Sequence, residues 1–450
     1  MNHINDNLSV RFSKINLRNF RNVKSGEFSS RVAFETMNKS DVLGLYGQNG
    51  SGKTAIVDAF KVLSILLREE NLKYVNKKLI HTDENELELD FEFLVKKEGK
   101  SYYIEYIVVL DEWNGTYRIL HERLNYKENI KGKRYKELVS FNGSSIAVRR
   151  KFPNTMPEEY KVQSLVSVKV AKEMNSSIIF QDELNEVYKN FFTQEEYTLF
   201  SALYYEFANS LHIIENADYG LLMANVLMPF NFSEARKRGT VAIFESEDTP
   251  VSEEIFTLLK DTVFPSINRI LPTIIPGLTI EISRVGEKLS KEGAEGIQVQ
   301  LIAIRDHKRL PLSEESDGVK KIISILSVLS FVFNDSNACV VIDELDSGIF
   351  EYLLGELLKV IHESGRGQLI FTSHNLRILE MLPIENLWFT TTDENLRYVK
   401  LKSNQKSTNN RAAYIRALLM SDQGHELYER TQNQKIKQAF KKIRFLENEQ

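Results

Sequence analysis

Cysteine is nearly absent from this chain of 450 residues, which contains a single cysteine, Cys339. No disulfide framework can therefore form within the chain, and this composition favours a cytoplasmic location. Long apolar runs are missing too: there is no stretch of about 18 apolar residues, so no membrane span is predicted. The polar start, MNHINDNLSVRFSK, contains no apolar signal segment. The eight histidines are scattered, without the Cys/His spacing of a zinc site.

A large excess of one charge is also missing. The net charge is −4, so the field of the whole molecule does not favour nucleic acid, although a local patch could. The stretch His121–Lys151 is such a patch, with nine Lys/Arg against three Glu. It has two interpretations, charged protection of solvated strand edges or a surface that faces DNA. The tail Lys435–Phe445 is a basic amphipathic helix, interpreted as a docking or solvated helix or as a second nucleic-acid contact.

The order of the predicted elements indicates an α/β protein of two or three domains. An apolar run predicts a buried strand at Asp41–Tyr46, and helical spacing predicts a helix over Ala55–Leu67. Alternation from Leu87 to Val148 predicts an antiparallel sheet. Residues 180–270 look mostly helical, and the helix–strand alternation after Leu310 predicts a parallel sheet with flanking helices.

The loop between that first strand and helix predicts a phosphate site. Its sequence, GQNGSGKT, matches G-x-x-x-x-G-K-[ST], with a strand before it and a helix after it. Glycines let successive backbone N–H groups point at phosphate oxygens, and the helix start adds its positive dipole end. We predict that ATP contacts all eight residues, Gly47, Gln48, Asn49, Gly50, Ser51, Gly52, Lys53 and Thr54. Lys53 would reach the β- and γ-phosphates, and the Thr54 hydroxyl would bind Mg²⁺.

A second metal ligand is predicted in ACVVIDELDSG, residues 338–348. Its apolar residues form a buried strand, and Asp343 and Glu344 follow at the carboxyl end, where open α/β sheets bind ligands. Asp343 would hold Mg²⁺, and Glu344 would deprotonate the attacking water. Alone, such a pair could equally cap the next helix. His374, after the strand that begins at Gln368, is predicted to contact the γ-phosphate, the alternative being a structural histidine.

A second phosphate-binding helix end is predicted in LPLSEESDGVKKIISILSVLSFVF, residues 310–333. Ser316 or Asp317 is a good N-cap, and the helix start offers free N–H groups with a positive dipole. One nucleotide cannot easily use this end and the glycine loop of the same chain. Two subunits placed head to tail can, with each ATP between the loop of one and Ser316–Gly318 of the other.

Together these motifs resemble an ABC-type ATPase of the SMC/RecF/OLD group. The resemblance covers INLRNFRNV near the start, the Walker A loop, the signature-like ESDGVKK, the Walker B strand, a D-loop around Asp346 and the switch histidine. It implies an ABC-type P-loop ATPase head of the α/β class, with a mixed or parallel sheet, an antiparallel β lobe and a helical insertion. The signature departs from LSGGQ but keeps Ser316, Gly318 and a following basic residue. Gln163 and Gln181 are both candidates for the Q-loop glutamine.

The resemblance also implies a domain order and a role. We expect lobe I at residues 1–175, a helical insertion at 176–275, lobe II at 276–400 and a helical tail at 401–450. The match is closest to OLD-like ATPases of anti-phage defence, such as the Septu and PARIS subunits. The tail is too short for a Toprim nuclease domain, and the insertion is too short for an SMC coiled coil. The resemblance therefore implies a homodimer or higher oligomer that controls a separate nuclease or toxin, with DNA or a phage component as a possible ligand.

Three other functions are weighed against this one. A RecF-like repair ATPase that binds DNA is the main alternative, motivated by His121–Lys151. A nucleotide-binding subunit of a transporter is disfavoured by the divergent signature and the long insertion. A metabolic P-loop kinase would leave Ser316–Gly318 and His374 without a role.

Overall fold

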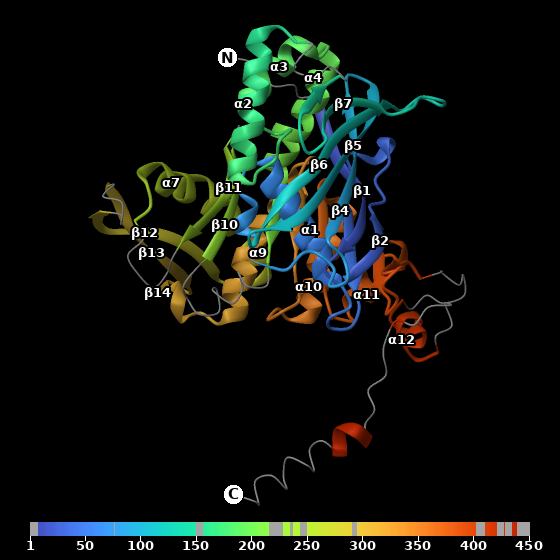
Figure 1. The fold of residues 1–450 in the computed structure, drawn as a ribbon. Helices are drawn as coiled ribbons and strands as arrows, with labels where there is room; N and C mark the ends of the chain where they lie inside the picture. The colour runs from blue at the N-terminus through green and yellow to red at the C-terminus, as the bar shows by residue number, and fades with distance from the viewer. Residues whose placement is uncertain are drawn as a thin grey trace, which may run out of the picture.

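The computed structural model describes most of the chain as a body of stacked sheets and helices (Figure 1). The described residues are 8–75, 77–149, 156–215, 228–234, 237–243, 250–289, 295–401, 410–420, 427 and 434–438. Among these residues, no helix is long and apolar enough to cross a membrane.

A seven-stranded antiparallel sheet forms one layer, in the order β2-β1-β4-β5-β6-β7-β8. Alternate residues of β4 and β5 are buried, as the period-two pattern predicts. The strands are β1 (Leu8–Phe20), β2 (Val23–Ser29), β4 (Glu86–Lys97), β5 (Lys100–Trp113), β6 (Thr116–Glu128), β7 (Lys136–Phe141) and β8 (Ile146–Val148).

The second layer is a six-stranded sheet in the order β18-β17-β3-β16-β15-β9, parallel except at β18. Its inner strands are short and wholly buried, because helices cover a parallel sheet on both faces. The strands are β3 (Asp41–Tyr46), β9 (Leu211–Ile214), β15 (Cys339–Ile342), β16 (Gln368–Thr372), β17 (Leu387–Thr390) and β18 (Tyr398–Val399). All parallel strands end at one edge, which positions the site described below.

Helix α1 (Lys53–Leu67) lies between the two sheets and is buried along almost its whole length. Phe60 of this helix meets Phe12 of β1 edge to face at 4.9 Å, and Phe91 of β4 at 5.9 Å. One large core therefore joins both sheets to α1. A second core packs the other face of the six-stranded sheet against α9 (Asp317–Asn334) and α10 (Glu351–Ser364).

The region predicted to be mostly helical is more mixed. Helix α2 (Glu158–Met174) precedes residues 180–270, which contain α3 (Asn185–Phe191), α4 (Gln194–Ser201), α5 (Ala208–Ser210), α7 (Glu253–Leu258) and the start of α8 (Phe264–Ile274). The region also contains β9 and a hairpin of β10 (Met228–Glu234) and β11 (Lys237–Ile243). The predicted helical character therefore holds for much of the region, but β9 is a strand of the main sheet beside β15.

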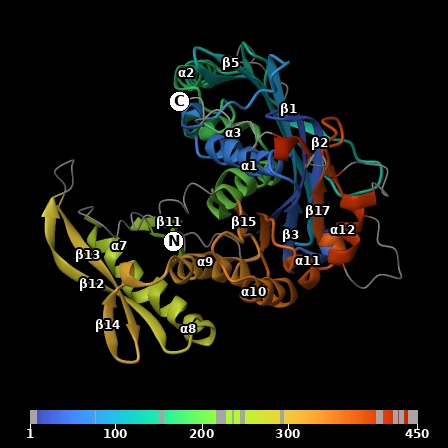
Figure 2. The same ribbon diagram turned by 90° about the horizontal axis from the view of Figure 1, so that it is seen from below.

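A separate three-stranded sheet, β12 (Leu278–Leu289), β13 (Glu295–Arg305) and β14 (Lys308–Pro311), stands to one side with α7 and α8 (Figure 2). It leads through β14 directly to α9. The chain closes with α11 (Ile378–Met381) and α12 (Asn410–Met420). Residues 434–438 of the predicted tail helix are helical, and the rest of Lys435–Phe445 lies outside the described residues.

These layers confirm the predicted α/β class, with a mixed, largely parallel sheet and an antiparallel β lobe. The domain boundaries after residues 175, 275 and 400 stay a prediction.

Cys339 offers a direct probe of this core. Its side chain is fully buried in β15, and burial raises the pKa of its thiol to about 12. We expect alkylation of the native thiol to be at least about 1000-fold slower than in the unfolded chain, because only rare opening exposes it. Mass spectrometry after timed labelling measures both rates, and rapid labelling of the native chain would contradict the packing of β15.

Candidate nucleotide-binding site

The glycine loop connects β3 to α1 in the tight geometry that a phosphate cradle requires. Gly50 and Gly52 have φ of 77° and 97°, which favours glycine. Gly47 has no room for a side chain, since an added Cβ would lie 1.7 Å from the Thr390 hydroxyl oxygen. That hydroxyl lies 2.5 Å from the Ser51 hydroxyl, and Ser51 also donates to the Gln48 carbonyl at 2.6 Å. Asn49 lies exposed at the tip of the loop.

Lys53 begins α1 and folds back over the loop. Its Nζ donates to the carbonyls of Gly47 at 2.9 Å and Gln48 at 3.1 Å. Burial lowers the pKa of Lys53, while the nearby charges of Asp343 and Glu344 act to raise it. The lysine therefore lies between the loop and the carboxylates at the end of β15, where a phosphate would meet it. Thr54, the next residue, is half-buried and lines a cleft beside the loop.

Asp343 and Glu344 follow β15 at the same sheet edge. Thr372, at the end of β16, donates to Asp343 Oδ1 at 2.6 Å and accepts from the Glu344 N–H at 2.8 Å. Glu344 has φ of 49°, in the left-handed region where a residue with a side chain is strained. Such strain is often kept at functional sites. Thr372 thus fixes both the Asp343 carboxylate and the backbone of the turn that carries Glu344.

His374 is tied to Asp346, because its backbone N–H donates to Asp346 Oδ2 at 3.2 Å. Partial burial and the charge of Lys53 lower the pKa of the imidazole, although nearby carboxylates oppose them. His374 is therefore neutral at pH 7, which suits a hydrogen bond to a phosphate oxygen without a competing salt bridge.

Ser316 is the N-cap of α9, and its Oγ accepts a 3.4 Å hydrogen bond from the Val319 N–H. An added Cβ on Gly318 would lie 3.0 Å from the Gly348 carbonyl oxygen. Lys321 of α9 also donates to the Ser347 carbonyl. The start of α9 thus packs against the loop after Asp346 of its own chain, whereas the glycine loop makes hydrogen bonds with Asn22, Thr390 and Tyr398.

Lys321 gives this contact a measurable pH dependence. Burial lowers the pKa of Lys321 to about 8, against 10.5 for an ordinary lysine. Between these values the unfolded chain binds a proton that the folded chain has lost, so stability rises with pH. We expect the unfolding free energy of the wild type to gain about 2 kcal/mol, relative to Lys321→Met, from pH 7 to pH 9.5. Denaturant titrations at both pH values measure this difference in unfolding free energy. If the difference between the wild type and Lys321→Met is the same at both pH values, burial does not lower the pKa of Lys321.

A cleft of about 580 Å³ runs along the glycine loop and Thr54. Its other walls come from the β1–β2 turn and the segment before β4, with Arg21, Asn22, Lys78 and His81 among them. Sequence reasoning noted INLRNFRNV without giving Arg21 or Asn22 a role, and no motif marks Lys78 or His81. The pairing of β1 with β4 and a bridge between Phe20 and Ile80 bring these segments together at the loop.

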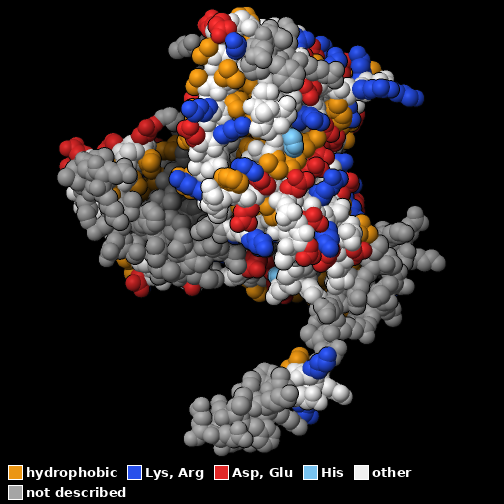
Figure 3. All heavy atoms as spheres, viewed as in Figure 1, with side chains coloured by type: hydrophobic (Ala, Val, Ile, Leu, Met, Phe, Trp, Pro, Cys, Tyr) orange, Lys and Arg blue, Asp and Glu red, His pale blue; other side chains and the backbone are white. Residues whose placement is uncertain are grey.

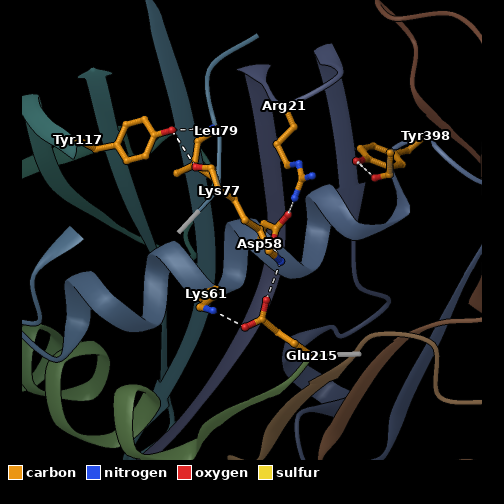
Figure 4. Close-up of polar contacts among 9 residues, drawn as sticks. Arg21, Asp58, Lys61, Lys77, Leu79, Tyr117, Glu215 and Tyr398 are labelled. Carbon is orange, nitrogen blue, oxygen red and sulfur yellow. Dashed lines mark hydrogen bonds and ion pairs between the residues drawn. The ribbon is translucent and has the colours of Figure 1, made fainter. Parts of the chain in front are cut away.

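An ion network lies next to the cleft, because its member Arg21 also lines the cleft, and Figure 4 shows the network. Asp58 of α1 is 1% exposed and pairs with Arg21 and with Lys77, at 2.8 Å in the second case. Glu215, directly after β9, pairs with Lys77 at 2.7 Å and with Lys61. Hydrogen bonds from Lys61 and Lys77 lower the pKa of Glu215 against the opposing effect of burial. The network connects α1, the β1–β2 turn and the end of β9.

Neither predicted Q-loop glutamine lies at this sheet edge. Gln163 of α2 donates to the Glu183 carbonyl, and buried Gln181 donates to the Ser177 carbonyl at 2.6 Å. β9 is the neighbour of β15 on the side away from β16, and the Asp343 N–H donates to the Ile214 carbonyl at the end of β9, at 2.9 Å. The residue that follows this strand is Glu215, so an acidic residue occupies the position beside Asp343.

The residues present fit a nucleotide with Mg²⁺. Gly50 and Gly52 allow the positive-φ turns of the loop, and Lys53 supplies a cation beside it. Thr54 and Asp343 would hold the metal, and phosphate oxygens and water would complete its ligands. Among the described residues there is no group of three or more His, Cys, Asp or Glu able to hold a metal without such help.

A family model described as "AAA domain, putative AbiEii toxin, Type IV TA system" matches residues 42–380. No curated protein matches the chain in sequence. Many solved structures resemble it, and three of them are described next. An SMC head bound to the C-terminal winged-helix domain of ScpA is 11% identical, covering 88% of this chain and 98% of its own, with a TM-score of 0.40. The SMC head from Thermotoga maritima is 13% identical, with coverage of 87% and 100% and a TM-score of 0.34. The SMC head with an extended coiled coil, bound to the C-terminal domain of ScpA and derived from Pyrococcus furiosus, is 11% identical, with coverage of 87% and 96% and a TM-score of 0.37.

Proposed function

The chain belongs to the AAA-domain family whose model matches it, and from that premise we propose that it is a cytoplasmic ATPase that dimerises around ATP. Each ATP lies between the glycine loop of one subunit and Ser316–Gly318 of the other, with Asp346 at the same interface. ATP binding closes the dimer, and hydrolysis opens it, so the nucleotide biases an equilibrium between two arrangements.

The observation that carries the proposal is the placement of the two helix starts. Lys53 begins α1 at the loop, whereas Ser316 begins α9 beside Ser347 and Gly348 of its own chain. Both starts present a positive dipole end, and a second subunit would bring the α9 end to the phosphates. The geometry of Glu344 supports the hydrolytic step. Its carboxylate would take a proton from water as the water oxygen attacks the γ-phosphorus and ADP leaves.

Subunit mixing tests whether the site is shared. Lys53→Ala and Ser316→Arg are each expected to abolish hydrolysis as separate proteins, the second because a bulky side chain fills the partner half of the site. In an equal mixture, half of the dimers would combine one intact loop with one intact signature, and about a quarter of the wild-type activity should return. A mixture as inactive as its components would contradict the shared site. Lys53→Ala mixed with Glu344→Gln, which leaves no complete site, is the matched control.

We also propose that this ATPase controls a separate effector, a nuclease or toxin, in anti-phage defence of the Septu or PARIS kind. The toxin and antitoxin wording of the family description supports that setting. The purified chain is expected to leave plasmid and phage DNA intact with ATP and Mg²⁺. Efficient cleavage by the chain alone, lost in Glu344→Gln, would contradict a separate effector.

DNA binding is a second candidate function, favoured by the hairpin between β6 and β7. This hairpin projects from the body, and its tip carries Lys and Arg side chains (Figures 1 and 3). Lys131, Lys133 and Arg134 are exposed there, with Lys133 3.8 Å from Glu128. If these three meet phosphates, the binding constant should fall with a slope of about −3 in log salt, and replacing all three with Ser should remove that slope. Binding insensitive to salt would exclude this function.

A further inference from the structure

Helix α2 exposes its large apolar side chains and buries smaller, partly polar ones. Five apolar side chains are exposed, namely Val162 at 51%, Leu165 at 49%, Val166 at 54%, Val170 at 37% and Met174 at 49%. The side that faces the protein is small and partly polar, with Ser164, Ser167, Val168 and Ala171 buried. A surface helix normally places its apolar stripe toward the core. The outward stripe is therefore a surface that another apolar surface would cover.

The exposed stripe is continuous. Val162, Val166 and Val170 are spaced by four residues, so they lie above one another on one face of the helix. Met174, four residues after Val170, continues this row, and Leu165 lies beside it. Figure 3 shows hydrophobic side chains gathered along α2 at the top of the molecule. An apolar row of this kind can pack against a similar apolar row on another helix.

Two charges on the same face identify the partner. Glu159 precedes Val162 by three residues, and Lys169 follows Val166 by three; both side chains are exposed. When two copies of α2 pair antiparallel about a two-fold axis, Val162 of each faces Val166 of the other. In that same register Glu159 faces Lys169 of the other copy, twice. A parallel pairing would place like charges opposite each other, which is unfavourable.

We propose that α2 is a self-association surface, on which a second copy of this chain docks its own α2 antiparallel. The contact is isologous and needs no nucleotide. It is small compared with stable interfaces of about 1,600 Å², so we expect a dissociation constant in the micromolar range. Both ribbon views place α2 at the far end of the molecule from α10 and α11 (Figures 1 and 2). The surface is thus separate from the proposed ATP interface, and one chain can use both, which links ATP-held dimers into larger closed assemblies.

Sedimentation of the nucleotide-free full chain tests this interface apart from the ATP-dependent one. The wild type should form a dimer between about 1 and 100 μM. Val166→Lys should raise the dissociation constant at least about 10-fold, because each lysine would then face Val162 of the other copy in the apolar part of the contact. Val360→Lys is the matched control, since Val360 is a helical valine exposed to 52% on α10. A nucleotide-free monomer over this range, or equal weakening by both variants, would overturn the proposal.

Charge exchange tests the identity and direction of the partner. Glu159→Lys alone and Lys169→Glu alone should each weaken the nucleotide-free dimer, because each places like charges opposite each other. In a mixed dimer of the two variants, position 159 of each copy faces a residue of opposite charge at position 169 of the other. The mixed dimer should therefore be several-fold tighter than the dimer of either variant alone. If mixing gives no gain over the parents, the antiparallel register is wrong. A failure of ATP-dependent closure would leave both results unchanged, because no nucleotide is present.

Discussion

Glu344→Gln is expected to lower ATP turnover by at least about 100-fold while leaving ATP binding intact. The amide cannot accept the proton of the attacking water, and loss of a general base typically costs 100- to 10,000-fold. Glutamine keeps the size of the side chain and meets the same backbone strain as Glu344, at φ of 49°. The N–H of residue 344 still donates to Thr372, so the turn should survive. Phosphate release measures the turnover, and a fluorescent ATP analogue measures the binding.

The control for this change is Thr372→Val. It removes the hydroxyl that joins Asp343 to residue 344 but leaves both carboxylates in place. We expect a smaller loss of turnover, with a higher Mg²⁺ requirement, because Asp343 loses a 2.6 Å hydrogen bond that fixes its direction. Turnover of Glu344→Gln within about threefold of the wild type would show that another group activates the water.

Gly47→Ala should abolish ATP binding although it adds only a methyl group. The new Cβ would lie 1.7 Å from the Thr390 hydroxyl oxygen and 2.8 Å from that of Ser51. The loop must move to relieve this overlap, and the carbonyl of residue 47 that Lys53 contacts must move with it. We expect nucleotide affinity to fall at least about 100-fold, because the amides of the loop leave the phosphate positions. Isothermal titration with ATP and Mg²⁺ gives the affinity.

Gly50→Ala is the matched control, because the space around its Cβ is open for 4 Å and only its φ of 77° opposes a side chain. Its effect should be limited to about 1 kcal/mol of backbone strain. Thr390→Ala in the Gly47→Ala background should restore part of the affinity, since it removes the closest atom. Equal losses at positions 47 and 50 would indicate that glycine matters there for backbone conformation rather than for space.

The sequence predicted well what depends on contiguous residues. The glycine loop, the buried strand before it and the helix after it lie within one short segment, and the structure has β3 and α1 there. The same holds for β15 and for Ser316 as the N-cap of α9. In each case the residues that define the element are neighbours in the chain, so local periodicity and capping rules suffice.

Features that depend on contacts between segments far apart in the sequence could not be predicted. β9 is four residues long and sits among helices in the chain, so only its pairing with β15 identifies it as part of the sheet. For the same reason Glu215 could not be placed beside Asp343, and two glutamines elsewhere looked equally suitable. The two partners of Asp58, Arg21 and Lys77, come from separate segments that no motif connects. The outward apolar face of α2 was also missed, because periodicity shows that a stripe exists but not which way it points.

The mass of Glu344→Gln in solution, measured by light scattering with and without ATP and Mg²⁺, tests the central claim most directly. The chain should be measured below the concentration at which the α2 contact forms, or as the double variant with Val166→Lys. The account predicts that ATP doubles the mass of Glu344→Gln, and that Ser316→Arg in the same chain prevents the doubling. A mass that stays that of a monomer with saturating ATP would contradict it, and Ser316 would then be only the cap of its own helix.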